Sequence, residues 1–141
     1  MNADCFLDTN VLVYAAAGRE TEETKRKLAL ELIENRDFCL SAQVLQEFYV
    51  VVTRKIERPM PAEQALEWIE RLEAFPCLAV DNALVKVAVE ISERHQIFYW
   101  DGAIIAAAEG MGVHTLYSED LNHGQRYGSV EVRDPFRAES T

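Results

Sequence analysis

Four acidic residues stand at places where a carboxylate could do chemistry, namely Asp8, Glu47, Asp101 and Asp120. Asp8 directly follows the apolar run Cys5-Phe6-Leu7, where the pattern predicts the end of a buried strand. Glu47 shares one side of a predicted helix with Val44 and Val51, which is a costly setting for an unpaired charge. Carboxylate oxygens are the ligands that Mg²⁺ and Mn²⁺ prefer, so this set is suited to a divalent metal ion.

Taken singly, each acid also has an ordinary structural explanation. Asp8 and Asp101 both precede predicted helices and could act as N-caps. Glu47 could pair with a basic residue later in its own helix, and Asp120 could be a surface turn residue. Capping and surface pairing do not explain why all four should reach one end of a sheet, which is what the predicted elements imply.

Short apolar runs alternate with helical patterns along the chain. The pattern predicts strands at residues 4–8, 38–40, 76–80, 114–117 and 130–132. It predicts helices at residues 10–17, 20–35, 42–55, 61–74, 82–95 and 101–110, with Leu84, Val85, Ala88 and Ile91 facing inward. Such alternation with short links predicts an α/β fold, with a mostly parallel sheet of four to five strands and helices on both faces. We expect a single domain over residues 1–141.

A parallel sheet also predicts where the acids meet. Ligands of open parallel sheets bind beyond the carboxyl ends of the strands, so Asp8 and Asp120 should face one crevice. Several carboxylates in one crevice repel each other, and no basic residue lies next to the four in sequence. A divalent cation resolves this repulsion, and the absence of Cys and His from the set argues against zinc. We expect Thr9, Asn10 and Ser118 to support the carboxylates by hydrogen bonds.

The order of these motifs resembles that of PIN-domain ribonucleases, and most of all the VapC toxins of bacterial toxin–antitoxin pairs. The resemblance rests on Asp8-Thr9-Asn10, on Glu47 in a helix after Ser41, on Trp100-Asp101-Gly102-Ala103 with Ala106-Ala107, and on Ser118-Glu119-Asp120-Leu121. It runs from residue 4 to about residue 136. Ser118 replaces the threonine that is common in the last motif and retains its hydroxyl. Glu119 adds an acid that we interpret as pointing outward.

The resemblance implies a three-layer sandwich and an endoribonuclease that depends on Mg²⁺ or Mn²⁺. Carried over, the metal ligands are Asp8, Glu47, Asp101 and Asp120. One or two ions would activate the attacking water and stabilise charge on the phosphate, leaving a 5′-phosphate. The resemblance also implies a homodimer and a cognate VapB-like antitoxin that inhibits the enzyme. The helix pair at residues 42–74 offers more apolar surface than one core needs, and we expect part of it to be an antitoxin groove or dimer contact. Its apolar residues are Phe48, Tyr49, Val52, Trp68 and Ile69.

The formal net charge of the 141-residue chain is −10, which makes it a poor general binder of polyanions. Four of these charges belong to the proposed site, where bound cations would offset them. The candidate contacts to an RNA backbone elsewhere are Arg54, Lys55, Arg58 and Arg126.

Cysteine usage and hydropathy predict the compartment. The three cysteines are far apart and have apolar neighbours, so we expect buried free thiols in a reducing cytoplasm. We recognise neither a secretory signal nor an apolar stretch long enough to span a bilayer, and therefore expect a cytoplasmic protein without membrane contact.

Two other classes of function stay open at this level. A metal-dependent phosphatase with a nucleophilic aspartate usually has a second aspartate two positions later, but that position is Asn10 here. A catalytically silent PIN-like module that binds RNA or protein could keep the fold without the activity. The presence of all four acids favours the enzyme.

Overall fold

The computed structural model describes residues 3–137 of the chain. Its centre is a six-stranded sheet in the order β3-β2-β1-β4-β6-β5. The strands are β1 (Cys5–Leu7), β2 (Phe38–Ser41), β3 (Cys77–Leu78), β4 (Thr115–Tyr117), β5 (Arg126–Tyr127) and β6 (Val130–Arg133). Every pairing is parallel except that of β5 with β6. The predicted α/β class with a mostly parallel sheet is confirmed.

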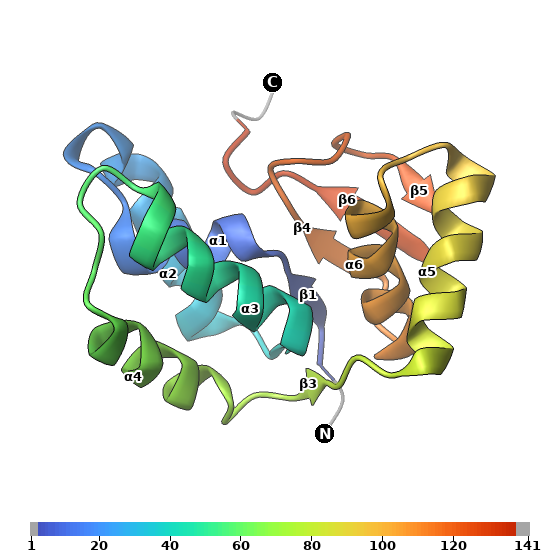
Figure 1. Cartoon of the computed structure of the whole chain (residues 1–141). Helices are drawn as coiled ribbons and strands as arrows, with labels where there is room; N and C mark the ends of the chain where they lie inside the picture. Colours follow the sequence, from blue (N-terminus) through green and yellow to red (C-terminus); the bar gives the residue numbers. More distant parts are fainter. Residues whose placement is uncertain (1–2, 138–141) are drawn as a thin grey trace.

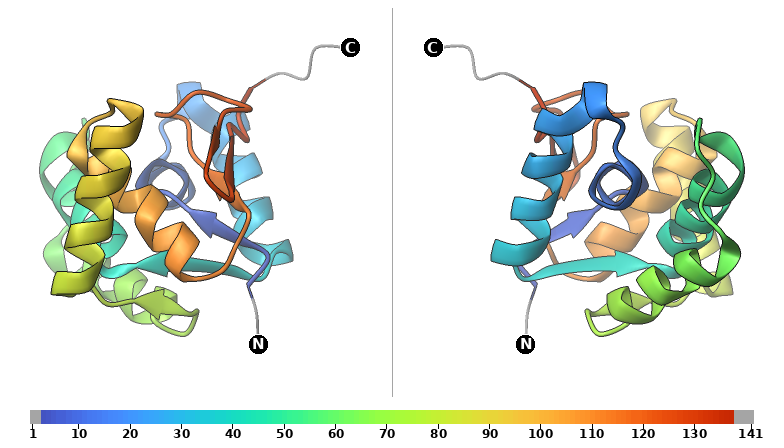
Figure 2. Two further views of the ribbon diagram at one scale, coloured as in Figure 1. Left: turned by 90° about the vertical axis from the view of Figure 1, so that its right-hand side faces the viewer. Right: turned by 90° about the vertical axis from the view of Figure 1, so that its left-hand side faces the viewer.

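Helices flank the sheet on both sides. They are α1 (Thr9–Ala17), α2 (Glu23–Asn35), α3 (Ala42–Val50), α4 (Ala62–Leu72), α5 (Asn82–His95) and α6 (Tyr99–Gly110). A short 3₁₀ turn (Glu20–Glu22) precedes α2, and a π-helical segment (Val51–Lys55) continues α3. In Figure 1, α1 to α4 are drawn to the left of β1, and α5 with α6 to its right. The side views of Figure 2 show α2 and α5 on opposite sides of the strands.

Local sequence explains why the first elements begin and end where they do. All residues of β1 and β2 are buried, which their continuous apolar runs predict for inner strands of a parallel sheet. Asp8 caps α1 by accepting a hydrogen bond from the Thr9 backbone, and Ser41 caps α3 through the Val44 backbone. Because Asp8 directly follows β1 and Ser41 is the last residue of β2, the starts of α1 and α3 lie at the same edge of the sheet.

The sheet has one more strand than the four to five predicted. Arg126–Tyr127 is too short to show a period, and it joins the sheet by a turn through Gly128, whose φ is +61°. The predicted strand at residues 76–80 shrinks to Cys77–Leu78 at the open edge of the sheet. Cys77 is therefore exposed, contrary to the prediction, whereas Cys5 and Cys39 are buried free thiols as expected.

Two helix predictions also need correction. The helix at residues 42–55 changes to a π-helical segment at Val51. Val85 was predicted to face inward but is 39% exposed, because α5 packs mainly on α6, and Ala88 and Ile91 supply its buried residues. None of the helices described has the length and apolar character needed to cross a membrane.

The close packing of α5 against α6 depends on Gly102. A Cβ at this position would lie 3.0 Å from the carbonyl oxygen of Ala88 and 3.0 Å from the Cβ of Ser92. We expect Gly102→Ala to lower the free energy of unfolding, measured in urea, by about 1–3 kcal/mol, because a buried backbone would have to shift. A Cβ added at Gly110 would lie 3.4 Å from its nearest neighbour, a side-chain carbon of Leu78. Gly110→Ala should keep or slightly raise stability, and an equal loss in both variants would contradict the packing argument.

Candidate active site

The first pair of site residues is brought together by strand register. β1 and β4 are parallel neighbours, with Leu7 opposite Tyr117, so the next residues, Asp8 and Ser118, leave the sheet side by side. The Asp8 backbone N–H donates to the Tyr117 carbonyl oxygen at 3.0 Å. The Ser118 hydroxyl donates to the Asp8 carboxylate at 2.7 Å. Asp8 is only 6% exposed, so this carboxylate lies at the floor of the site.

Asn10 connects the start of α1 to the loop that carries Asp120. Its side-chain amide donates to Asp120 Oδ2 at 3.1 Å and to Ser118 Oγ at 3.4 Å, and its Oδ1 accepts from the Glu119 backbone at 3.2 Å. Thr9 contacts Asp8 only through its backbone N–H, at 2.7 Å. The Thr9 hydroxyl is buried and has no hydrogen-bond partner among residues 3–137. Asn10 and Ser118 therefore contact the acids through their side chains, whereas Thr9 does not.

Glu47 is oriented by a residue that the sequence analysis missed. The Gln43 side chain donates to Glu47 Oε1 at 2.8 Å and to the Trp100 carbonyl oxygen at 3.3 Å. It thereby connects α3 to the start of α6, where Asp101 lies in the first turn. The available signal was the position of Gln43 four residues before Glu47, on the same helical face.

Electrostatics show that the four acids lie within reach of one another. The pKa of Asp8 is raised to about 6, mainly by burial and in smaller part by the charges of Asp120 and Glu47, although the hydrogen bonds from Ser118 and Thr9 lower it. Burial also raises the pKa values of Glu47 and Asp101, and the charge of Asp120 contributes to both. None of the four forms an ion pair in the described part of the chain. The structure thus brings the four acids together as an electrostatic cluster.

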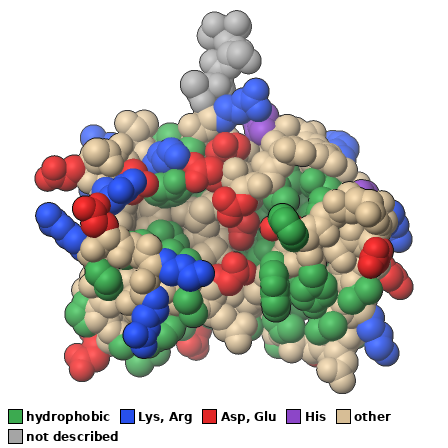
Figure 3. Space-filling model, turned by 45° about the horizontal axis from the view of Figure 1, so that its top comes forward, with side chains coloured by type: hydrophobic (Ala, Val, Ile, Leu, Met, Phe, Trp, Pro, Cys, Tyr) green, Lys and Arg blue, Asp and Glu red, His purple; other side chains and the backbone are tan. Residues whose placement is uncertain are grey.

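The acids are near one another without being in mutual ligating contact. Within residues 3–137, no three Asp, Glu, His or Cys side chains stand close enough to hold one ion. Glu47 and Asp120 line a groove of about 430 Å³ between α1 and α3, which also contains Lys55. Asp101 opens instead onto a neighbouring hollow beside α5. Figure 3 shows acidic side chains gathered in the middle of this face, with hydrophobic side chains exposed beside them.

Comparison with known proteins decides the family. The PIN domain family model matches residues 5–127, which include all four acids. The chain belongs to the PIN domain family. A search among curated proteins gave no sequence match. The predicted family is therefore confirmed by the family model and by solved structures.

Those solved structures share the fold of this PIN domain at low sequence identity. VapC20 of Mycobacterium tuberculosis, a Sarcin-Ricin loop cleaving toxin, is 19% identical, with a TM-score of 0.66 over 82% of this chain and 89% of that one. A toxin–antitoxin complex from Klebsiella pneumoniae is 16% identical, with a TM-score of 0.69 over 93% and 97%. VapBC2 of Rickettsia felis, bound to a promoter DNA fragment, is 18% identical, with a TM-score of 0.62 over 92% and 96%.

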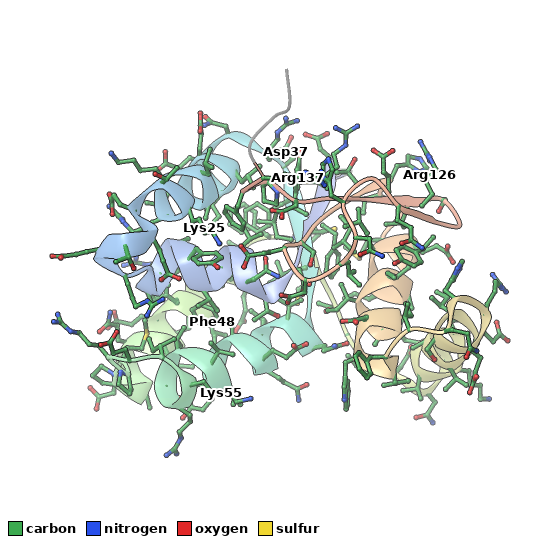
Figure 4. All side chains as sticks on the ribbon, turned by 90° about the horizontal axis from the view of Figure 1, so that it is seen from above. Lys25, Asp37, Phe48, Lys55, Arg126 and Arg137 are labelled. Carbon is green, nitrogen blue, oxygen red and sulfur yellow. The ribbon has the colours of Figure 1, made fainter. Side chains whose placement is uncertain are left out.

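In this PIN domain Glu119 does not point outward, contrary to our interpretation of the sequence. Its carboxylate accepts hydrogen bonds from the Tyr14 hydroxyl at 2.6 Å and from the Lys25 ammonium. These bonds, first of all the one to Glu119, raise the pKa of Lys25. Lys25 also lies over the rings of Tyr14 and Phe136, and Figure 4 shows it between α1 and α2. The loop before Asp120 is thereby fastened to both helices.

This contact should be measurable as a coupling between Lys25 and Glu119. Their side chains are 38% and 27% exposed, so solvent screens the pair partly. In a double-mutant cycle of Lys25→Met and Glu119→Gln, we expect a coupling energy of about 0.5–1 kcal/mol by urea denaturation. The exposed pair Arg26–Glu23 on α2 is the matched control and should give less. A coupling no larger than that control would show that the loop is not held by this pair.

The four residues predicted to contact an RNA backbone are spread around the PIN domain. Lys55 lines the groove near Glu47, and Arg58 lines the adjoining hollow. Arg126 instead pairs with Glu131 on β6 and lies on the far side of the molecule from Lys55, as Figure 4 shows. Arg54 is exposed on the π-helical segment.

The apolar residues of the helix pair at residues 42–74 differ in how deeply they are buried. Phe48 and Val52 are completely buried, so they belong to the core and not to the part of the helix pair that was expected to contact a partner. Tyr49, Trp68 and Ile69 are partly buried and pack against the core. The large apolar residues exposed on α3 and α4 are instead Val50 and Leu66.

Proposed function

We propose that this PIN domain is an Mg²⁺- or Mn²⁺-dependent endoribonuclease that acts as the toxin of a type II toxin–antitoxin pair. The observation that carries the proposal is the cluster of Asp8, Glu47, Asp101 and Asp120 beside the carboxyl ends of β1 and β4. Burial and mutual repulsion raise the pKa of Asp8, Glu47 and Asp101. Such repulsion is retained at a cost to stability, which is typical of a functional site.

The chemistry of the donor set fits a hard divalent cation. The four side chains offer only carboxylate oxygens, and none is neutralised by an ion pair in the described residues. Asp8, Glu47, Asp101 and Asp120 would hold one or two such ions, and their side chains would have to move closer together to do so. A bound ion of this class lowers the pKa of water and stabilises negative charge on a phosphate.

The residues around the carboxylates have positioning roles in this proposal. Ser118 and Asn10 fix the oxygens of Asp8 and Asp120 by the hydrogen bonds described above. Gln43 does the same for Glu47. Because these donors are neutral, they orient the carboxylates without competing for their charge. The groove between α1 and α3 leads from Glu47 and Asp120 to Lys55, which would attract an RNA phosphate.

Structural neighbours support the biological part of the proposal. Among them are a toxin named for cleaving the Sarcin-Ricin loop and complexes of toxins with antitoxins. By analogy, a VapB-like antitoxin would inhibit this chain, two copies of which would form a homodimer in the cytoplasm. Copurification of the product of an adjacent reading frame would test the antitoxin, and sedimentation would test the dimer.

The cleavage experiment uses the purified protein and total cellular RNA. RNA is incubated with Mg²⁺, with Mn²⁺ or with EDTA, and new 5′ ends that carry a phosphate are mapped by sequencing. We expect a limited set of new ends with either metal and none with EDTA. Equal cleavage in EDTA would overturn the metal-dependent mechanism. RNA binding without any cleavage would indicate a catalytically silent PIN module instead.

A further inference from the structure

Two large aromatic side chains are exposed next to the acid cluster. Phe98 is 82% exposed and Trp100 is 66% exposed, more than any other large hydrophobic residue described in the structure. Phe98 is the N-cap of α6, and Trp100 lies in its first turn, directly before Asp101. We call Phe98 and Trp100 the aromatic rim. A folded chain exposes such side chains at a cost, which points to a binding role.

Gln43 connects the aromatic rim to the acid cluster. The backbone oxygen of Trp100 accepts a hydrogen bond from Gln43, the same side chain that orients Glu47. The ring of Tyr99 packs edge-on against the Trp100 ring, with centroids 5.0 Å apart. Asp101 and Phe98 line one hollow.

The charge of the chain bears on how the protein could hold RNA. With a net charge of −10, the protein gains little affinity for RNA from phosphate neutralisation. Arg126 and Arg133 are engaged with Glu131, so an acid of the chain itself already offsets these two cations. Stacking of bases on aromatic rings needs no positive charge and is open to every base. An acidic nuclease can therefore hold RNA at such a rim.

We propose that Phe98 and Trp100 form a stacking platform for unpaired RNA bases next to the bond that is cleaved. The inference rests on the proposed function, because it takes RNA as the substrate. Paired bases are stacked on each other and offer no free face, so the platform selects single-stranded or looped RNA. It would place the neighbouring phosphate beside Asp101.

Binding measured without metal separates the platform from catalysis. In EDTA, titrating fluorescein-labelled single-stranded RNA of mixed sequence into the protein should quench Trp100 fluorescence. The chain has two tryptophans, so the experiment is done in a Trp68→Phe background, in which Trp100 is the only tryptophan. A matched hairpin duplex should quench little. Failure of the cleavage experiment would overturn the proposed function, whereas the quenching reports the platform by itself.

Substitutions give the decisive comparison. Measured by anisotropy in EDTA, Trp100→Ala and Phe98→Ala should each weaken single-stranded RNA binding roughly 5- to 100-fold. The slope of log affinity against log salt should not change, because no phosphate contact is removed. Leu66→Ala, at a residue that is 53% exposed on α4, is the control and should bind as the wild type.

Two results would overturn the platform. One is wild-type affinity in both aromatic variants. The other is loss of a dimer in sedimentation by Trp100→Ala or Phe98→Ala together with unchanged RNA affinity, because the rim would then be a contact between two copies of the chain. Circular dichroism of each variant checks that the fold is retained, as expected for side chains that are mostly exposed.

Discussion

Asp120→Asn is expected to lower the initial rate of RNA cleavage at saturating Mg²⁺ by roughly 100- to 1,000-fold. The substitution removes one charged oxygen from the acid cluster but keeps a side chain that can accept the hydrogen bond from Asn10. The fold should therefore survive, and the melting temperature should change little. Glu47→Gln should behave similarly, because Gln43 can still donate to its side-chain oxygen.

The matched control for this prediction is a carboxylate in the same groove. Glu57 lines the groove with Glu47 and Asp120, but its side chain is 73% exposed and pairs loosely with Arg19. Glu57→Gln should cleave RNA at the wild-type rate. If Asp120→Asn cleaved as fast as Glu57→Gln, the four-carboxylate mechanism would be excluded. An equal loss in both would indicate that general negative charge in the groove is what matters.

Asp8→Asn is expected to abolish cleavage and yet to stabilise the metal-free protein above pH 6. Burial raises the pKa of Asp8 from 3.8 to about 6. Between these values the folded state keeps a proton that the unfolded state has released, so the stability contributed by this group falls as pH rises from about 4 to 6 and stays low above that. A shift of about two units corresponds to about 3 kcal/mol.

Asparagine at this position is neutral at every pH and removes this loss. In the wild type, Ser118 donates a hydrogen bond to the Asp8 carboxylate. This bond has to rearrange in Asp8→Asn, which offsets part of the gain in stability. We expect a net increase of about 1–2 kcal/mol at pH 7.5 in EDTA, or about 2–8 °C in melting temperature. At pH 4.5 the difference should nearly vanish, since wild-type Asp8 is then mostly protonated.

Calorimetry at both pH values measures the effect, and Glu57→Gln provides the control. Some fall in stability with rising pH should persist in Asp8→Asn, because the raised pKa values of Glu47 and Asp101 act in the same direction. An Asp8→Asn protein less stable than the wild type at pH 7.5 would show that its hydrogen bonds outweigh its desolvation. Adding Mg²⁺ should stabilise the wild type more than the variant, since a cation neutralises the buried charge.

The two predictions share one physical origin. Carboxylates gathered to bind a cation repel each other and so oppose folding of the metal-free chain. Removal of one of these charges therefore lowers activity and raises stability. Asp8 shows this most clearly because it is both the most buried acid of the set and the cap of α1.

Much of the fold could be predicted because its signals are local. The runs before Asp8 and Ser41 are short, continuous and apolar, which is typical of inner parallel strands, and each is followed at once by a capping side chain. The side-by-side arrangement of Asp8 and Ser118 follows from two adjacent parallel strands that end at matching positions. Order of motifs along the chain was also sufficient to predict the PIN family.

The tertiary structure decided the contacts between residues that are far apart in sequence. The bond from Lys25 to Glu119 spans 94 residues, and that from Gln43 to the Trp100 carbonyl spans 57, so neither leaves a periodic trace in the chain. The same holds for burial, because Val85 and Phe48 have similar helical patterns, yet one faces solvent and the other the core. Sequence alone indicated the four acids as candidates for the site, whereas helix packing decided which residues touch them, because exposure and pairing depend on neighbours that local periodicity does not specify.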